Sequence, residues 1–170
     1  STVSLGTFWG ALGDSNVFDP RVLYDSFAHR WIATAIANPG TSEMHFVKAL
    51  DDGPEMQGVL ALFEGVATGA ADGYGRMTDH PAATLLHLGS GLANGSANLH
   101  NARRAATPMV NIVGDHATHH KRFDAPLDSD IEASAGTTSG WLRTSARPED
   151  IARDAAEAVA AAFGPPGQIA

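Results

Sequence analysis

The sequence predicts an α/β domain built on a mainly parallel sheet with helices on both faces. Short apolar runs of about five or six residues alternate with longer segments of helical pattern along most of the 170 residues. Strands that are apolar throughout are typical of parallel sheets, because crossover helices cover both faces. The length suits one domain, and the 44% hydrophobic and 18% charged residues suit a globular protein with a buried core.

Each expected strand is an apolar run that ends at turn residues. These runs are residues 32–37, 58–62, 81–88 and 109–113, with residues 141–144 as a candidate fifth strand. The first run ends at Asn38-Pro39-Gly40, which is a turn signal. Another strand begins at residues 168–170, so we expect the domain to be part of a larger protein.

Helical segments occupy the spaces between these runs. They are expected at residues 24–30, 43–50, 64–77, 92–105 and 148–163. Ser42 is expected to cap the second segment, and Pro148 stands in the first turn of the last. Residues 1–22 show no period and are expected to form an N-terminal arm or leader, so the domain itself would span residues 23–170.

Composition argues against several classes of protein. The chain has 11 basic and 19 acidic residues, and a net charge of −8 disfavours a binder of nucleic acid or of anionic membranes. Without cysteine it has no disulfide, zinc–thiolate site or cysteine nucleophile. No apolar run approaches the roughly 20 residues that span a bilayer, and no signal-peptide pattern is present, so we expect a cytoplasmic protein.

Polar groups follow three of the expected strands. The first strand leads into Pro39, Gly40 and Thr41, the second into Glu64, and the third into His87. Ligands of open α/β sheets bind at the carboxyl ends of the strands. The sequence therefore predicts a ligand site at this edge of the sheet.

Glu64 stands between an apolar strand and a helix. Burial among apolar neighbours would suit its carboxyl group to hold or relay a proton near neutral pH. The alternative is that the carboxylate only caps the helix, where the helix dipole favours negative charge. The residues alone leave both roles open.

A glycine-rich segment follows His87, which by itself could be a core histidine. Gly89-Ser90-Gly91 before a helix resembles the G-x-G-x-x-G pattern that binds a pyrophosphate, although Asn94 replaces the third glycine. Asp115 stands near the place of a ribose-binding acid. A nicotinamide-dinucleotide-binding oxidoreductase domain is therefore an alternative.

The loop after the fourth strand is rich in histidine and aspartate. Its polar residues are Asp115, His116, His119, His120 and Asp124. Such side chains could bind a divalent metal ion. A solvated polar loop is the alternative, because a loop offers no fixed face for the ligands. We assign no metal site to this chain and leave the role of these histidines open.

Four motifs follow one another in the chain. Residues 38–43 read NPGTSE, residues 62–76 read LFEGVATGAADGYGR, residues 87–94 read HLGSGLAN, and residues 107–114 read TPMVNIVG. In this order they resemble the N-terminal pyrimidine-binding domain of thiamine-diphosphate-dependent enzymes of the acetolactate synthase and benzoylformate decarboxylase type. The resemblance implies a sheet of about six strands.

The resemblance also implies roles for single residues. Glu64 would hydrogen-bond N1′ of the aminopyrimidine and favour the imino tautomer that removes the thiazolium C2 proton. His87 would lie near the reacting carbon as a proton donor or acceptor, and Thr41 would hold the substrate carboxylate. The pyrimidine pocket would be lined by Pro39, Gly40, Gly91 and Asn94.

The family's metal and diphosphate motif, G-D-G followed by asparagines, has no counterpart in this sequence. Its only Gly-Asp pairs are Gly13-Asp14 and Gly114-Asp115, and neither is followed by glycine. The resemblance therefore implies that Mg²⁺ and the diphosphate bind another domain, of the same or another chain, in a homodimer or homotetramer. The chain alone would be inactive.

The implied reaction is decarboxylation of a 2-oxo acid, followed by transfer or release of the acyl unit. Synthases place a glutamine after the fourth strand, where this sequence has Asp115-His116. This departure argues against strict acetolactate synthesis. An acetolactate synthase-like enzyme is nevertheless the first hypothesis, and a decarboxylase of the benzoylformate type is the second. A catalytically silent interaction domain is a further alternative.

Overall fold

The centre of the computed structural model is a parallel sheet of four strands in the order β4-β3-β5-β6. The structure describes residues 24–25, 30–31, 34–52, 56–164 and 167–170. The strands are β3 (Thr34–Asn38), β4 (Gln57–Leu60), β5 (Ala82–Leu86) and β6 (Met109–Val113). This arrangement confirms the predicted α/β class.

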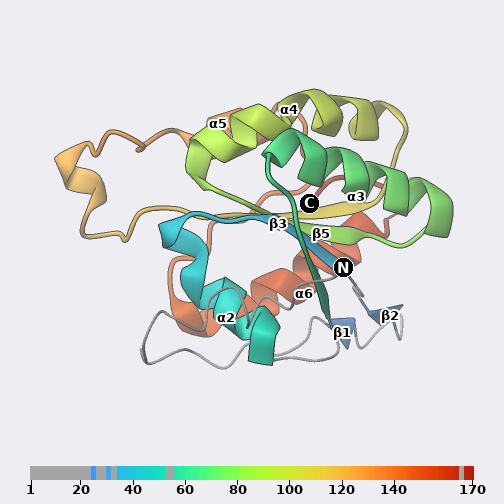
Figure 1. Cartoon of the computed structure of the whole chain (residues 1–170), viewed down its shortest axis with the longest axis horizontal. Coiled ribbons are helices and arrows are strands. Elements are labelled where there is room, and N and C mark those ends of the chain that lie inside the picture. Colours follow the sequence, from blue (N-terminus) through green and yellow to red (C-terminus); the bar gives the residue numbers. More distant parts are fainter. Residues whose placement is uncertain (1–23, 26–29, 32–33, 53–55, 165–166) are drawn as a thin grey trace.

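Helices cover both faces of this sheet (Figure 1). One face carries α3 (Glu64–Thr78), α4 (Leu88–Arg104) and the short α5 (Ile131–Ala135). The other carries α2 (Met44–Asp52) and α6 (Ile151–Ala162). Three short 3-10 helices are η1 (Thr41–Glu43), η2 (Lys121–Phe123) and η3 (Pro148–Asp150).

Side chains of β3, β5 and β6 alternate between apolar cores on the two faces of the sheet. Ile36 and Leu86 belong to the core under α3 and α4, whereas Ala35 and Ala83 belong to the core over α6. Successive residues of a strand point to opposite faces, so a strand covered on both sides is apolar throughout. β5 is the clearest case because all five of its residues are buried.

The edge of the sheet beside β6 is occupied by residues from the end of the chain. Ile169 forms a parallel bridge with Met109, and the amide of Asn111 donates a 2.8 Å hydrogen bond to the carbonyl of Ala170. Residues 168–170 thus pair with β6 through one parallel bridge, at the place where the sequence predicts that a strand begins. The resemblance implies a sheet of about six strands. The described residues show four strands and this bridge.

The prediction of a strand at residues 141–144 is wrong. The structure shows no strand there; instead, the amides of Gly140 and Trp141 both donate to the carbonyl of Ile169. The segment runs past the terminal residues without forming a ladder, because Ile169 already occupies the place beside β6.

The prediction of a helix at residues 24–30 is also wrong. Its ends form β1 (Tyr24–Asp25) and β2 (Arg30–Trp31), which pair antiparallel. A segment this short makes fewer than two helical turns, so pairing with another strand is the stronger way to satisfy its backbone groups. The arm expected at residues 1–22 lies outside the described residues.

α4 begins at Leu88, four residues before the predicted start, so the glycine-rich segment is the first turn of the helix. Leu88 has a φ of 53°, in the left-handed region that costs a non-glycine residue about 1–3 kcal/mol. Its side chain is 1% exposed. Packing of this leucine therefore holds the sharp turn between β5 and α4.

Small residues let α3 and α4 pack side by side. A Cβ atom at Gly95 would lie 2.8 Å from Cγ2 of Thr68, and one at Gly69 would lie 3.1 Å from Nδ2 of Asn98. The close approach also allows polar contacts, since Nδ2 of Asn98 donates a 2.6 Å hydrogen bond to the carbonyl of Gly65. These contacts fix the start of α3 relative to α4.

A buried carboxylate ties the loop before α6 to that helix. Asp154 is 5% exposed and accepts hydrogen bonds of 2.9 Å from Oγ of Ser145 and from Nη2 of Arg153. Burial raises the pKa of Asp154. The two hydrogen-bond donors and the charges of Arg153 and Arg143 together lower the pKa by more than burial raises it, so it lies below its ordinary value. The ionised form therefore stabilises the fold.

Within the part of the chain that the structure describes, no helix is both long and apolar enough to cross a membrane. The cytoplasmic location stays a prediction.

Candidate active site

The carboxyl ends of β3, β4 and β5 lie side by side and lead into the predicted site residues. β3 pairs with both β4 and β5, all parallel, so their carboxyl ends share one edge of the sheet. β3 continues into Gly40 and Thr41, β4 into Glu64, and β5 into His87. The sequence prediction of three converging loops is therefore correct.

Glu64 is the first residue of α3 and is 8% exposed. Its Oε2 accepts a 3.0 Å hydrogen bond from Nδ2 of Asn94, which lies in the second turn of α4. Among the described residues, Oε1 has no hydrogen-bond partner. One oxygen of the carboxylate is thus fixed and the other can accept a hydrogen bond from a ligand.

Gly91 lies between Glu64 and His87. A Cβ atom at this position would be 3.0 Å from Oε1 of Glu64 and 3.4 Å from Cβ of His87. The missing side chain at Gly91 lets the carboxylate of Glu64 and the His87 side chain approach the first turn of α4 closely. The structure therefore joins Glu64, Gly91, Asn94 and His87 into one cluster, as the sequence predicted.

The side chain of His87 is 23% exposed and packs against the β3–η1 turn. A Cβ atom at Gly40 would overlap the His87 ring, so only glycine allows this contact. Asn38 braces the same turn, because its Nδ2 donates a 2.8 Å hydrogen bond to the carbonyl of Ala61. Pro39 and Thr41 flank Gly40 in the chain, and Thr41 is exposed at the start of η1.

Glu43 is a member of this cluster that the prediction of site residues missed. It is 2% exposed, and its Oε2 lies 2.8 Å from Nδ1 of His87. The same oxygen accepts a 2.7 Å hydrogen bond from the amide of Gly40. A glutamate three residues after a helix start is the pattern of a capping box, and this signal could have found it.

These features match a known family. A family model described as "Thiamine pyrophosphate enzyme, N-terminal TPP binding domain" matches residues 21–135, more than half of the chain. The chain belongs to the thiamine pyrophosphate enzyme family. The resemblance inferred from the four motifs is thereby confirmed.

Two curated relatives place this domain in longer members of the thiamine pyrophosphate enzyme family. A protein of Mycobacterium tuberculosis (strain ATCC 25618 / H37Rv), provisionally named as an acetolactate synthase large subunit, IlvX, is 61% identical over 141 residues, covering 83% of this chain and 27% of that protein. Benzoylformate decarboxylase of Pseudomonas aeruginosa is 30% identical over 145 residues, covering 84% and 27%. The chain thus spans 27% of the length of these relatives.

A solved structure supports the same assignment. The thiamine diphosphate-dependent 4-hydroxybenzoylformate decarboxylase of Rhodococcus jostii RHA1 superposes with a TM-score of 0.76 at 25% identity, over 81% of this chain and 26% of that chain. All the predicted site residues, from Pro39 to Asn94, lie inside the segment that the family model matches. Their individual roles stay predictions.

The family match does not support a dinucleotide site, and the geometry gives a physical reason. Gly91 approaches the carboxylate of Glu64. A pyrophosphate bound at the start of α4 would meet this negative charge, which is unfavourable in a partly buried place. In this thiamine pyrophosphate enzyme domain, Gly91 instead allows the close approach of the Glu64 carboxylate.

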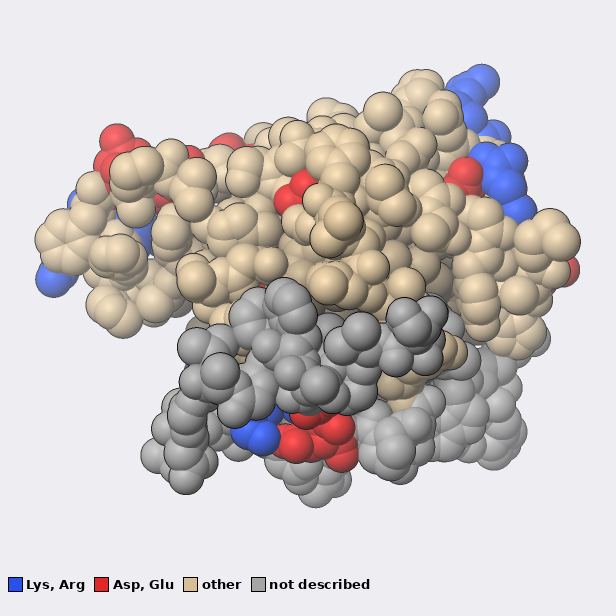
Figure 2. Space-filling model, viewed as in Figure 1, with Lys and Arg blue, Asp and Glu red and all other residues tan. Residues whose placement is uncertain are grey.

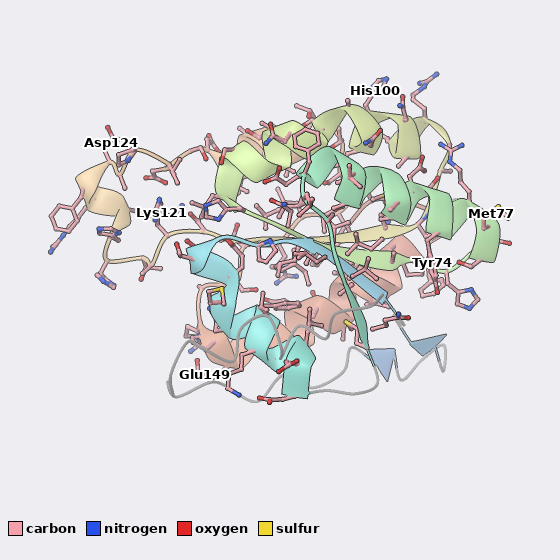
Figure 3. The ribbon with its side chains drawn as sticks, viewed as in Figure 1. Tyr74, Met77, His100, Lys121, Asp124 and Glu149 are labelled. Atoms are coloured by element: carbon pink, nitrogen blue, oxygen red, sulfur yellow. The ribbon has the colours of Figure 1, made fainter. Side chains whose placement is uncertain are left out.

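The polar loop between β6 and α5 extends away from the sheet, and Lys121 and Asp124 mark it in Figure 3. Lys121 forms a 2.6 Å ion pair with Asp115, and the ring of His120 contacts those of His116 and His119. Among the described residues no group of three or more histidine, aspartate or glutamate side chains is placed to hold a metal ion. Asp115 and these three histidines thus have contacts within the loop, and the role of the histidines stays open.

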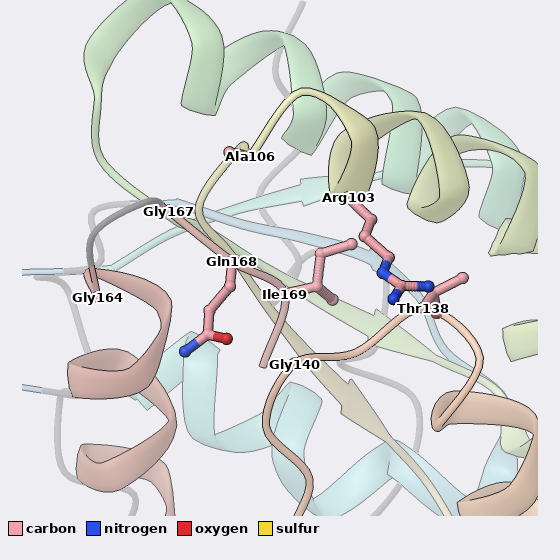
Figure 4. Close-up of a pocket in the computed structure, with 8 residues that line it drawn as sticks. All are labelled: Arg103, Ala106, Thr138, Gly140, Gly164, Gly167, Gln168 and Ile169. Carbon is pink, nitrogen blue, oxygen red and sulfur yellow. The ribbon is translucent and has the colours of Figure 1, made fainter.

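A cavity of about 280 Å³ lies near the start of β6, at the amino ends of the strands and not at the carboxyl ends that carry the predicted site (Figure 4). Its lining includes Arg103, Thr138 and Ile169 and none of the predicted site residues. Nη1 of Arg103 donates a 2.8 Å hydrogen bond to the carbonyl of Thr137, so the guanidinium already has a partner. The candidate active site is the cluster around Glu64, and it lies away from this cavity.

Proposed function

We propose that this chain supplies the pyrimidine-binding half of the active site in an enzyme that uses thiamine diphosphate to decarboxylate a 2-oxo acid. When bound, the cofactor supplies a carbon nucleophile and an electron sink for this chemistry. The observation that carries the proposal is the carboxylate of Glu64, with Oε2 hydrogen-bonded to Asn94 and Oε1 close to Gly91 at the start of α4.

The cluster around Glu64 fits an aminopyrimidine ring. A flat heterocycle with ring nitrogens needs a hydrogen-bonding carboxyl group and a surface without a projecting side chain. Oε1 of Glu64 offers the first and Gly91 the second. In this proposal Glu64 holds a proton at N1′ of the ring, while Asn94 keeps the carboxyl group in place. Pro39 and Gly40 complete the wall of the pocket.

His87 and Thr41 would act on the substrate. The His87 ring is part exposed at the end of β5, so it can reach a bound molecule as a proton donor or acceptor. Thr41 is exposed at the start of η1, and its hydroxyl group would hold the substrate carboxylate. These two roles follow from the resemblance and from the position of both residues at the same edge of the sheet.

The remaining half of the site would come from a diphosphate-binding domain of the same or another chain, which would hold Mg²⁺ and the diphosphate. The proposal includes a homodimer or homotetramer that brings the two domains together. Support comes from the chain's 27% share of its relatives. On the face seen in Figure 2, few charged side chains lie over the middle of α3 and α4, which suits contact with another domain.

An acetolactate synthase-like reaction is the first candidate, supported by the 61% identity to the relative named as a synthase subunit. A decarboxylase of the benzoylformate type is the second, and a specific observation favours it. His87 stands at the end of β5, and its side chain lies close to Gly40 and Gly91, in the same cluster as Glu64. In its protonated form, an imidazole there can act as a general acid and donate a proton to the acyl unit, which then leaves as an aldehyde.

Ligand-dependent thermal stability tests this proposal. The assembled enzyme, containing this chain and its diphosphate-binding domain, should show a higher melting temperature with thiamine diphosphate and Mg²⁺ and no change with NAD. The Glu64→Ala variant should lose most of that stabilisation. Stabilisation by NAD and none by thiamine diphosphate would contradict the proposal and restore the oxidoreductase alternative.

A further inference from the structure

Glu43 is a buried carboxylate to which the proposed function gives no role. It ends η1 and is 2% exposed, although charged side chains are rarely buried this fully. Burying a carboxylate is costly unless specific donors compensate it. The contacts of Glu43 therefore indicate why this residue is there.

Both donors to Glu43 act on Oε2. The amide of Gly40 donates from 2.7 Å, and Nδ1 of His87 lies 2.8 Å away. An ionised carboxylate only accepts hydrogen bonds, so Nδ1 must carry the proton. In a neutral imidazole the lone pair is then on Nε2. Glu43 thus selects one tautomer of His87.

The surroundings hold this arrangement in place. A side chain at Gly40 would overlap the imidazole, and one at Gly114 would overlap Oε1 of Glu43. Oε1 itself is buried and has no hydrogen-bond partner among the described residues. The carboxylate is therefore enclosed on the side of Gly114 and makes both of its hydrogen bonds on the side of His87.

We propose that Glu43 is a positioning residue that orients the His87 ring and keeps its proton on Nδ1, so that Nε2 exchanges protons with the substrate. This inference rests on the proposed function for its catalytic consequence. A base oriented by a second group through its other ring nitrogen is the general arrangement by which enzymes fix an imidazole. Glu43 itself does not touch the substrate in this proposal.

A purely structural role is the competing explanation, because Glu43 also caps η1 through the amide of Gly40. Glu43→Gln separates the two. The glutamine oxygen can still accept from Gly40, so the cap remains, but the negative charge beside Nδ1 is lost. Glu43→Met removes both contacts. Asp52→Asn, at the exposed end of α2, is the control for general effects on this region.

The test uses steady-state kinetics and ¹⁵N NMR of the histidine ring in the assembled enzyme. Glu43→Gln should lower kcat about 10- to 100-fold with KM changed less than about twofold, and with the melting temperature close to that of Asp52→Asn. In the wild type the Nε2 signal of His87 should be that of an unprotonated nitrogen. In Glu43→Met, the form protonated on Nε2 should appear.

Two results would overturn the inference. One is a kcat for Glu43→Gln equal to that of the wild type in an enzyme that turns over with thiamine diphosphate. The other is a wild-type His87 protonated on Nε2. Failure of the proposed function is distinct from both, because a wild type without thiamine-dependent turnover shows it directly, whereas the NMR spectrum reports the Glu43–His87 contact in either case.

Discussion

Asn94 in α4 donates a 3.0 Å hydrogen bond to Oε2 of Glu64 at the start of α3. Two helices that follow different strands thus hold one carboxylate between them. Because of this hydrogen bond, Oε2 of Glu64 is fixed, whereas Oε1 is available to a ligand. Glu64 is therefore more than a simple helix cap. The first two predictions concern the environment of this carboxylate.

Asn94→Ala should weaken the binding of thiamine diphosphate about 10- to 100-fold, because a hydrogen bond to a charged group contributes about 1.5–3 kcal/mol. Isothermal titration calorimetry of the assembled enzyme measures the change. Ser96→Ala is the control, since Ser96 lies on the same helix but bonds to the carbonyl of Leu92. Equal affinities of the Asn94 variant and the wild type would show that Glu64 needs no support from α4.

Gly91→Ala should weaken the binding of thiamine diphosphate without lowering the stability of the fold. Alanine is favoured over glycine inside a helix by up to about 1 kcal/mol, so the fold should not weaken. Its methyl group would lie 3.0 Å from Oε1 of Glu64, so affinity for thiamine diphosphate should fall at least tenfold. Urea unfolding and calorimetry measure the two effects.

Gly73→Ala is the matched control for this substitution. A Cβ atom at Gly73 meets nothing within 4 Å, so the change should stabilise α3 without altering cofactor affinity. A Gly91 variant that behaves like the Gly73 variant in both measurements would contradict the pocket at Gly91.

Asp154→Asn should reduce the pH dependence of stability in acid. The pKa of Asp154 is lower in the folded protein than its ordinary value of about 3.9. Its ionised form therefore contributes stability above about pH 4, and this contribution is lost as pH falls through the lower folded pKa. The difference in unfolding free energy between wild type and variant should be largest near pH 7 and shrink below about pH 4.

Urea unfolding at several pH values measures this difference, with Asp51→Asn on the surface of α2 as the control. A constant difference between the wild type and the Asp154 variant from pH 7 to pH 3 would show that ionisation of Asp154 does not stabilise the fold.

Thr84→Val should destabilise the sheet by about 1–3 kcal/mol. Thr84 is fully buried and its hydroxyl group donates a 2.7 Å hydrogen bond to Oδ1 of Asn111 on β6. Valine has the same shape but leaves that oxygen without its donor. Thr118→Val, at an exposed position of the loop between β6 and α5, should change stability by less than about 0.5 kcal/mol. Denaturant midpoints distinguish the two outcomes.

The positions of Glu64 and His87 could be predicted because topology alone decides them. Glu64 and His87 directly follow buried strands, and parallel strands bring their carboxyl ends to one edge. The β6 boundaries were also predicted correctly, because an apolar run between Pro108 and Gly114 has clear ends. These results depend only on local pattern and on the geometry of parallel sheets.

The errors arise where contacts between distant residues decide the structure. Residues 141–144 look like a strand, but Ile169 takes the place beside β6. The start of α4 depends on Leu88, whose left-handed backbone is held by burial. A local capping pattern marks Glu43, but its contact with His87, 44 residues away, is not encoded by any local pattern.

The central claim is that Glu64 controls a proton on the cofactor, and exchange of the C2 proton of bound thiamine diphosphate tests it most directly. In the assembled enzyme, Glu64→Gln should slow exchange with deuterated solvent about 10²- to 10⁴-fold, as expected for loss of acid–base catalysis. Glu149→Gln, at the exposed η3, should leave the rate unchanged. Wild-type exchange in the Glu64 variant, with the cofactor bound, would contradict the account.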